Sequence, residues 1–228
     1  VTDEAGNQGS VADTATLDSG APSAPGVEIA DGDAFITADE IDTNGNVAVS
    51  IDLAGTNAEA DDTLTVNGAE LTLTQAQIDA GTVETTVSAP AEGEELTVAA
   101  TITDAAGNTS NEGRASAEVD TTAPGESGDG NAIAFDDGQI NASEQSDVTF
   151  TGQVEDGATI NSIVISDGEA NTADITVDAN DISVDGDGKV TVTGQDVSSL
   201  ADGDLTVTMT VTDEAGNQGS VADTATLD

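Results

Sequence analysis

The side chains of this protein that could do chemistry are almost all carboxylates. Its 228 residues include 46 Asp and Glu, only two basic residues, Arg114 and Lys189, and no His or Cys. Such a chain can offer a metal ion oxygen ligands only, which favours Ca²⁺ over transition metals. The same composition excludes thiol chemistry, disulfides, zinc sites built on Cys and His, and acid–base schemes that rely on His.

The formal net charge of −44 narrows the class of partner. Nucleic acid and anionic membrane surfaces are both bound through Lys and Arg, so we expect neither as a partner. The only aromatic residues are three Phe, so we expect no stacking platform for carbohydrate. No apolar run approaches the ~18 residues that span a membrane, and we see no signal peptide at the start. We expect a monomer.

A repeated segment divides the chain. Residues 1–18 and 211–228 have the same sequence, VTDEAGNQGSVADTATLD, and a diverged copy begins at Ile102. This period is that of a domain and not of a solenoid unit. We therefore predict two modules, residues 19–120 and 121–228, preceded at residues 1–18 by the terminal strand of a truncated module. On this interpretation the chain is cut from a longer tandem array. Residues 1–18 should fray, with pairing to a sheet edge of another molecule as the alternative.

Each module has the periodicity of β-structure. Leu205, Val207, Met209 and Val211 alternate with Thr, which is the pattern of a half-buried strand. Similar alternation begins at Val47, Leu96 and Val148. Only two short segments, residues 73–78 and 197–200, could each form a helical turn. We predict an all-β protein made of tandem immunoglobulin-like Greek-key β-sandwiches arranged end to end, joined by short linkers that Pro restricts.

This architecture would gather the acidic side chains at the module junctions. Antiparallel strands place alternate loops at opposite ends of a sandwich, so the loop after the first strand lies at the same end as the module's last residue. The Thr-Asp-x-Ala-Gly-Asn turn lies at the other end, facing the preceding module. Carboxylates packed this closely repel one another unless a cation lies among them, so we predict Ca²⁺ at each junction.

Three sets of ligands are predicted. The junction near residue 120 would use Asp31, Asp33, Glu40, Asp120 and Asp213, with Asn217 in the same turn as Asp213. The preceding junction would use Asp18, Asp104 and Asn108. The following one would use Asp136, Asp137, Glu144 and Asp228.

Simpler interpretations compete with the metal sites. Asp is common in turns for backbone reasons, so each acidic residue taken alone could be only a turn former. The segment Asp185–Lys189 resembles half of an EF-hand loop, but it lacks the later Glu and fits a hairpin turn better. Two carboxylates can act as a glycosidase pair, but nothing indicates an apolar pocket or an aromatic subsite, so we expect no enzyme activity.

The order of motifs in the second module resembles a known family. The sequence reads DGQINASE at 137–144, VTFTG at 148–152, VSSLADGDLTV at 197–207 and VTDEAGN at 211–217, and VDTTAP precedes them at 119–124. This order resembles the bacterial Ig-like repeats of giant biofilm-associated and RTX-type surface adhesins of Gram-negative bacteria. The first module departs more from that pattern, at residues 37–40 and over the irregular segment 61–90.

The resemblance implies a spacer function outside the cell. Such modules act as extenders that project a distal ligand-binding region from the cell surface for adhesion and biofilm formation, and Ca²⁺ between modules would stiffen the array. Two alternatives remain open. The module could itself bind a sugar, a protein or ice, which a flat exposed Thr or aromatic patch would indicate, although Thr here is spread over many strands. It could also be an accessory domain of a secreted halophilic hydrolase.

Overall fold

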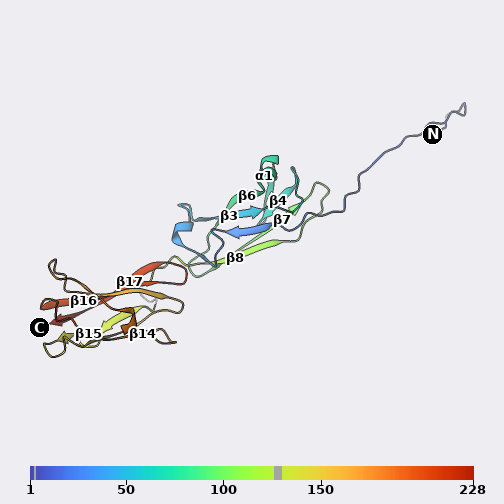
Figure 1. Ribbon diagram of the computed structural model, residues 1–228. Helices are drawn as coiled ribbons and strands as arrows, with labels where there is room; N and C mark the ends of the chain where they lie inside the picture. Colours follow the sequence, from blue (N-terminus) through green and yellow to red (C-terminus); the bar gives the residue numbers. More distant parts are fainter. Residues whose placement is uncertain (3, 126–129) are drawn as a thin grey trace. The chain divides into compact units, whose positions relative to one another are not determined.

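The structure is a computed structural model that describes residues 1–2, 4–125 and 130–228. Residue 3 of the repeated segment and residues 126–129 of the second predicted module lie outside the described part. Strands dominate the described residues, which contain one short α-helix, α1 (Gln75–Ala80), and two 3₁₀ turns (Figure 1). The all-β prediction is therefore confirmed. By internal contacts the chain forms two compact units, residues 1–32, 47–87 and 97–116, and residues 33–46, 88–96 and 117–228.

The first eight strands form two sheets. The three-stranded sheet has the order β1 (Gly26–Ile29), β3 (Asn46–Asp52), β6 (Thr82–Ser88). The five-stranded sheet has the order β2 (Phe35–Ile36), β8 (Gly113–Val119), β7 (Glu95–Thr103), β4 (Thr63–Val66), β5 (Ala69–Thr72). The segment 61–90, which departs from the family pattern in sequence, is regular in structure because it holds β4, β5, α1 and β6.

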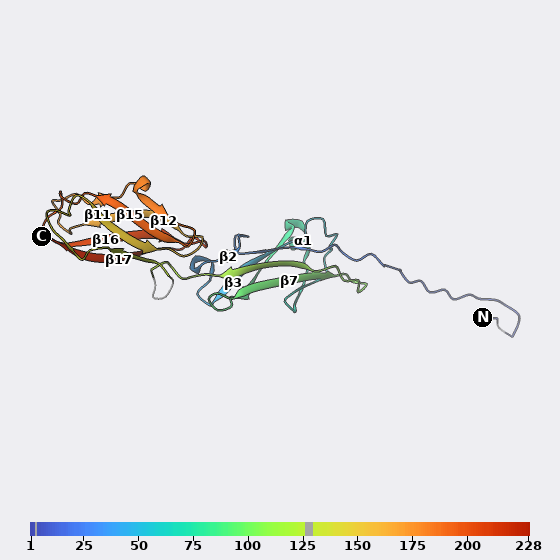
Figure 2. The ribbon, with the colours of Figure 1, turned by 90° about the horizontal axis from the view of Figure 1, so that it is seen from below.

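The remaining strands form two further sheets (Figures 1 and 2). The four-stranded sheet has the order β14 (Ile182–Val184), β15 (Lys189–Gln195), β11 (Val148–Gln153), β9 (Ala132–Phe135). The five-stranded sheet has the order β10 (Gln139–Ile140), β17 (Gln218–Leu227), β16 (Gly203–Thr212), β12 (Thr159–Ser166), β13 (Ile175–Thr176). The 3₁₀ turns are η1 (Ala38–Glu40) and η2 (Ala179–Asp181).

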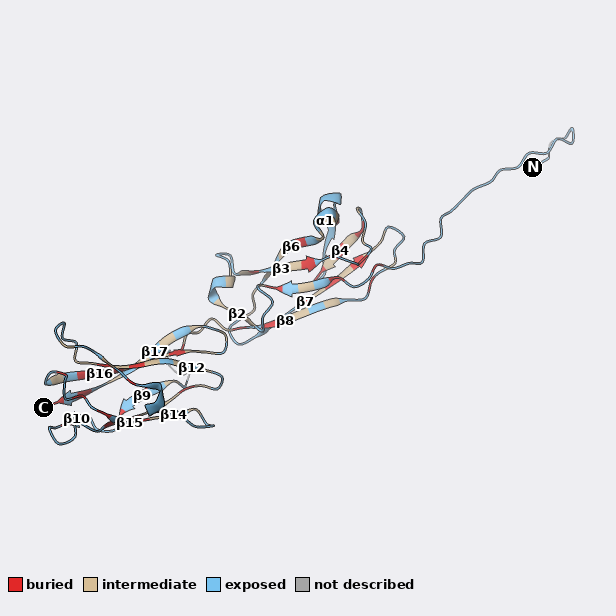
Figure 3. Ribbon diagram, viewed as in Figure 1, coloured by how far each residue is buried: buried red, intermediate tan, exposed pale blue. Residues whose placement is uncertain are grey.

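The core consists of the side chains that the alternating pattern predicted to face inward. On β16 the residues Leu205, Val207, Met209 and Val211 are fully buried, while the intervening Thr side chains are partly exposed. The rings of Phe135 and Phe150 meet edge to face with their centroids 5.3 Å apart. Most buried residues lie on the strands and a few, such as Leu73 and Val154, in loops, whereas α1 has no buried residue and the N-terminal segment is exposed (Figure 3).

Two very short strands escaped the sequence reasoning. Strand β2 pairs in parallel with β8, and β10 pairs in parallel with β17. Each short strand ends beside the residue that follows β8 or β17: the Asp120 amide donates to the Ile36 carbonyl at 3.0 Å, and the Asp228 amide donates to the Ile140 carbonyl at 2.9 Å. Two-residue strands leave too little alternation in a sequence to be recognised.

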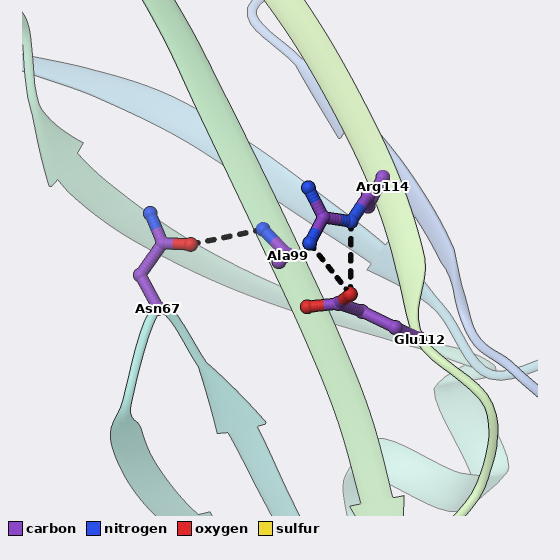
Figure 4. A network of polar contacts seen from close by, with 4 residues as sticks. All are labelled: Asn67, Ala99, Glu112 and Arg114. Carbon is purple, nitrogen blue, oxygen red and sulfur yellow. Dashed lines mark hydrogen bonds and ion pairs between the residues drawn. The ribbon is translucent and has the colours of Figure 1, made fainter.

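The predicted hairpin turn at residues 185–189 is confirmed. Asp185 Oδ1 accepts hydrogen bonds from the amides of Asp187 and Lys189, both at 3.0 Å, and closes the hairpin between β14 and β15. Asn67 and Gly68 join β4 to β5, and Asn67 Oδ1 accepts from the Ala99 amide of neighbouring β7 at 2.9 Å (Figure 4). The same view contains the ion pair of Arg114 with Glu112 at 2.8 Å.

The repeated 18-residue sequence adopts two different structures. Residues 218–227 form β17, whereas their counterparts 8–17 form no strand and make only one isolated bridge, from Thr2 to Gln8. Leu227 is 2% exposed, and the identical Leu17 is 91% exposed. A strand needs a partner to hold its backbone and cover its apolar face. The fraying of residues 1–18 stays a prediction, which the exposure of Leu17 and the absence of a strand over residues 8–17 favour.

Candidate metal-binding site

The Thr-Asp-x-Ala-Gly-Asn turn carries the same hydrogen bonds in two of its copies, at residues 103–108 and 212–217. In the second copy, Asp213 Oδ1 accepts from the Asn217 amide at 2.7 Å and Oδ2 accepts from Asn217 Nδ2 at 3.0 Å. In the first copy the corresponding distances from Asp104 to Asn108 are both 2.8 Å. A glycine with positive φ, Gly107 or Gly216, closes each turn. The turn therefore fixes both carboxylates with the same local geometry.

The asparagine of each turn also reaches the acidic residue that precedes the linker. Asn217 Nδ2 lies 3.1 Å from the Asp120 carbonyl oxygen and 3.3 Å from its Oδ1. Asn108 Nδ2 lies 3.3 Å from the Asp18 carbonyl oxygen. One amide nitrogen thus contacts the carboxylates of both Asp120 and Asp213, two residues far apart in the sequence that the prediction had placed together.

The surroundings of Asp120 disfavour its negative charge. Partial burial raises the pKa of the Asp120 carboxyl above its usual value, and the negative charges of Asp213 and Glu92 act in the same direction. Asp104 differs, because the Asn108 side chain and backbone amide lower its pKa. Asp120 is therefore a carboxylate whose ionised form would gain from a nearby cation.

Sequence reasoning missed Glu92. Its carboxylate accepts hydrogen bonds from the Thr121 amide at 3.0 Å, from Thr121 Oγ1 at 2.6 Å and from Thr122 Oγ1 at 2.8 Å. Desolvation acts to raise the pKa of Glu92, but these hydrogen bonds outweigh it and leave the pKa below its usual value. Glu92 lies in a Glu-Gly turn that has no unusual sequence. The only sequence signal for its role is the pair of Thr hydroxyls in the linker that donate to it.

The predicted ligands of the loop after the first strand have local hydrogen bonds of their own. Asp33 Oδ1 accepts from the Phe35 amide and Asp137 Oδ1 from the Gln139 amide, each at 2.9 Å. Glu40 caps η1 by accepting from the Thr37 amide at 2.8 Å, and Glu144 accepts from the Asn141 amide at 3.1 Å. The hydrogen bond of Asp33 matches that of Asp137, and the hydrogen bond of Glu40 matches that of Glu144. The loop therefore has the same local structure in both modules. They also show that each residue has a turn-forming role that needs no ion.

The other predicted ligands occupy simpler positions. Asp31 is exposed in the turn after β1. Asp136 accepts hydrogen bonds from Thr149 and Thr151 on β11. Asp136, Asp137 and Glu144, together with Asp147, line an open hollow of about 210 Å³.

The donor chemistry fits Ca²⁺, since carboxylate and carbonyl oxygens are the ligands that these turns present. Among residues 1–2, 4–125 and 130–228, however, no group of three or more acidic side chains lies close enough to hold a metal ion. The best-developed site contains a pair of carboxylates, Asp120 and Asp213, beside the Asn217 amide. The three ligand sets remain predictions.

One protein-family model matches two parts of the chain. The model of the bacterial Ig-like domain matches residues 36–121 and, a second time, residues 125–228. The chain belongs to the bacterial Ig-like domain family. The resemblance inferred from motif order is thereby confirmed, and it extends to the first bacterial Ig-like copy, whose sequence departs more from the pattern.

Solved structures similar to this bacterial Ig-like chain include two adhesins. One, from work on the host cell surface retention of a 1.5-MDa bacterial ice-binding adhesin, is 25% identical, with 91% of this chain and 65% of that chain covered and a TM-score of 0.49. The other, a Ca²⁺-stabilized adhesin of an Antarctic bacterium, is 28% identical, with 100% and 55% covered and a TM-score of 0.48. The chain thus spans less than two thirds of either structure. A search of curated proteins finds no match. No helix among the described residues is long and apolar enough to cross a membrane.

Proposed function

We propose that this chain is an extender segment of a large secreted surface adhesin. Its bacterial Ig-like modules would hold a distal ligand-binding region away from the cell, in adhesion and biofilm formation. The family and the tandem repeat support this role. The scarcity of aromatic side chains fits a spacer better than a recognition surface, and the net charge of −44 would keep a long extracellular array soluble and monomeric. Its partners are neighbouring modules of the same chain, and it catalyses no reaction.

The proposal includes Ca²⁺ at the linkers. The observation that carries it is the contact of one nitrogen, Asn217 Nδ2, with the carboxylates of both Asp120 and Asp213. The turn that holds Asp213 recurs at Asp104, where Asn108 reaches Asp18. A bound Ca²⁺ would supply positive charge and accept oxygen ligands in flexible geometry. Asp120 and Asp213 would hold it, and Asp31, Asp33 and Glu40 are the further ligands proposed for the same ion.

The mechanical consequence follows from charge. Without a cation the carboxylates of Asp120, Asp213 and Glu92 repel one another and oppose a fixed linker. With a cation bound, the same groups bridge the linker to the turn at residues 213–217 and the array stiffens. Extracellular sites of this kind bind weakly, with dissociation constants of roughly 10⁻⁴–10⁻³ M.

Isothermal titration calorimetry of the full chain with Ca²⁺ tests the site. We expect binding in that range, and a loss of about tenfold or more in affinity at one site in Asp213→Asn, because a charged ligand becomes neutral. Asp187→Asn is the control, since Asp187 lies in the β14–β15 hairpin turn. Absence of binding, or equal affinities in Asp213→Asn and Asp187→Asn, would contradict the calcium proposal.

A further inference from the structure

Two glycines on the last strands have no room for a side chain. A Cβ on Gly113, at the start of β8, would lie closer to the Pro25 carbonyl oxygen than the 3.0 Å that real Cβ atoms respect. A Cβ on Gly219, on β17, would meet the Pro124 carbonyl oxygen in the same way. Neither glycine has a positive φ, so backbone conformation does not require glycine at either position. The requirement comes from the close approach of a second backbone.

The carbonyl that approaches belongs to a proline in both modules, although the proline that matches Pro124 by linker sequence is Pro22. Pro25 and Pro124 each end the linker that leads into a module, and both are buried. In the second module a linker glycine is crowded by β17 as well, because a Cβ on Gly125 would collide with the Ser220 carbonyl oxygen. Backbone thus lies against backbone over residues 124–125 and 219–220. Proline contributes a fixed φ and glycine contributes the space.

The repeated sequence shows that this packing is not a property of the local sequence. Gly9 occupies the position of Gly219 in the same 18 residues, and nothing lies within 4 Å of where its Cβ would be. The small residue is needed where a linker docks.

We propose that Gly113 and Gly219 are linker seats: positions on the last strand where the incoming linker of each module docks through its final proline. The seats need no ion. Each fixes the point at which the chain enters its module, and Asn217, which holds Asp120 four residues before Pro124, adds a second attachment. Glu92 adds a third by holding Thr121 and Thr122. Each seat therefore holds the end of its linker against its own module without a cation. This goes beyond the calcium proposal and does not depend on it, because the cation would act on the repulsion among the carboxylates of Asp120, Asp213 and Glu92.

Hydrogen exchange measured by mass spectrometry on the full chain in excess chelator tests the seats. We expect Gly219→Ala to raise the exchange rate of the amides in residues 121–125 by about tenfold or more, because the added methyl group displaces the Pro124 carbonyl. Gly113→Ala should do the same for residues 20–27. Gly9→Ala is the matched control, with the same substitution in the same sequence, and should change neither segment.

A second variant covers the case in which Gly219→Ala unfolds the module, which faster exchange throughout β11 and β16 would reveal. Gly125→Ala presses on the same contact from the linker without changing the sequence of β17, and it also strains the backbone because Gly125 has a φ of +98°. It should raise exchange in residues 121–125 and in 218–222 while the buried strands stay protected. Exchange in Gly219→Ala equal to that in Gly9→Ala, or no local increase in Gly125→Ala, would overturn the proposal. Because chelator is present throughout, neither outcome depends on calcium binding.

Discussion

At the scale of the residue, the account depends on Asp120. Its carboxylate is partly buried and lies near the negative charges of Asp213 and Glu92, and it accepts hydrogen bonds from the Thr122 amide and from Asn217 Nδ2. A raised pKa means that folding favours the protonated form. The stability associated with this group is therefore fully present below its unfolded pKa and is lost as the pH rises through the folded pKa. At neutral pH and without a cation, ionised Asp120 costs stability.

The substitution Asp120→Asn should separate this cost from the benefit of a bound ion. In chelator it should raise the free energy of unfolding, by less than about 1 kcal/mol because solvent screens much of the repulsion. In Ca²⁺ the variant should lose the stabilisation that the ion gives the wild type. Urea denaturation at neutral pH with and without Ca²⁺ measures both effects, and Asp187→Asn is the control. An Asp120→Asn variant that is less stable in chelator and keeps its full response to Ca²⁺ would contradict this interpretation.

At the scale of the element, the two copies of the 18-residue sequence allow an internal comparison. Leu227→Ala removes a buried side chain from the end of β17 and should cost about 2–5 kcal/mol. Leu17→Ala makes the same change in the same sequence where the side chain is exposed, and should cost less than about 0.5 kcal/mol. Urea denaturation of the two variants checks this. Similar losses of stability would show that residues 8–17 also form a packed strand.

The helix α1 gives a second prediction at this scale. Thr74 accepts the Gln77 amide, and the Gln77 side chain accepts the Thr74 amide at 2.9 Å, so the two form a capping box. Thr74→Ala should cost about 0.5–2 kcal/mol because the Gln77 amide and the Gln77 side chain both lose the Thr74 hydroxyl as a partner. Thr72→Ala, on the exposed edge strand β5, is the control and should cost less. Equal losses in urea denaturation would argue against the cap.

Much of the fold could be predicted from the sequence because half-buried strands alternate visibly. The runs at Val47, Leu96, Val148 and Leu205 all became strands with the expected buried face. The parallel pairings of β2 and β10 could not be predicted, since two residues show no period. The different structures of residues 8–17 and 218–227 have no local cause, because the sequences are identical and only the pairing of 218–227 with β16 and β10 separates them.

For the candidate site, sequence reasoning identified the repeated turn and its link to the residue before the linker. It paired Asp213 with Asp120 and Asp104 with Asp18, and the Asn217 and Asn108 side chains now connect those pairs. It could not identify Glu92, whose role depends on where the turn at residues 91–94 lies relative to the linker hydroxyls. The seats at Gly113 and Gly219 were equally hidden, because a glycine in a strand does not reveal which backbone approaches it.

At the scale of the whole molecule, the net charge of −44 makes every cation stabilising to some degree. Screening and specific binding can be separated by matching ionic strength. If the sites have dissociation constants of 10⁻⁴–10⁻³ M, about 10 mM Ca²⁺ should stabilise a module by about 1.4–2.7 kcal/mol through linkage. NaCl at equal ionic strength should give less, because it only screens exposed charges. Equal stabilisation by the two salts in urea denaturation would reduce the calcium effect to screening.

The central claim is that the chain is a spacer whose stiffness depends on Ca²⁺ at the linkers. Small-angle X-ray scattering of the full chain, recorded in Ca²⁺ and again in excess chelator at matched ionic strength, tests it most directly. The account predicts that the chelated chain is more flexible and that its distribution of dimensions is broader, while Ca²⁺ gives a narrower distribution with a defined maximum dimension. A maximum dimension and a flexibility that do not change between the two conditions would contradict the claim.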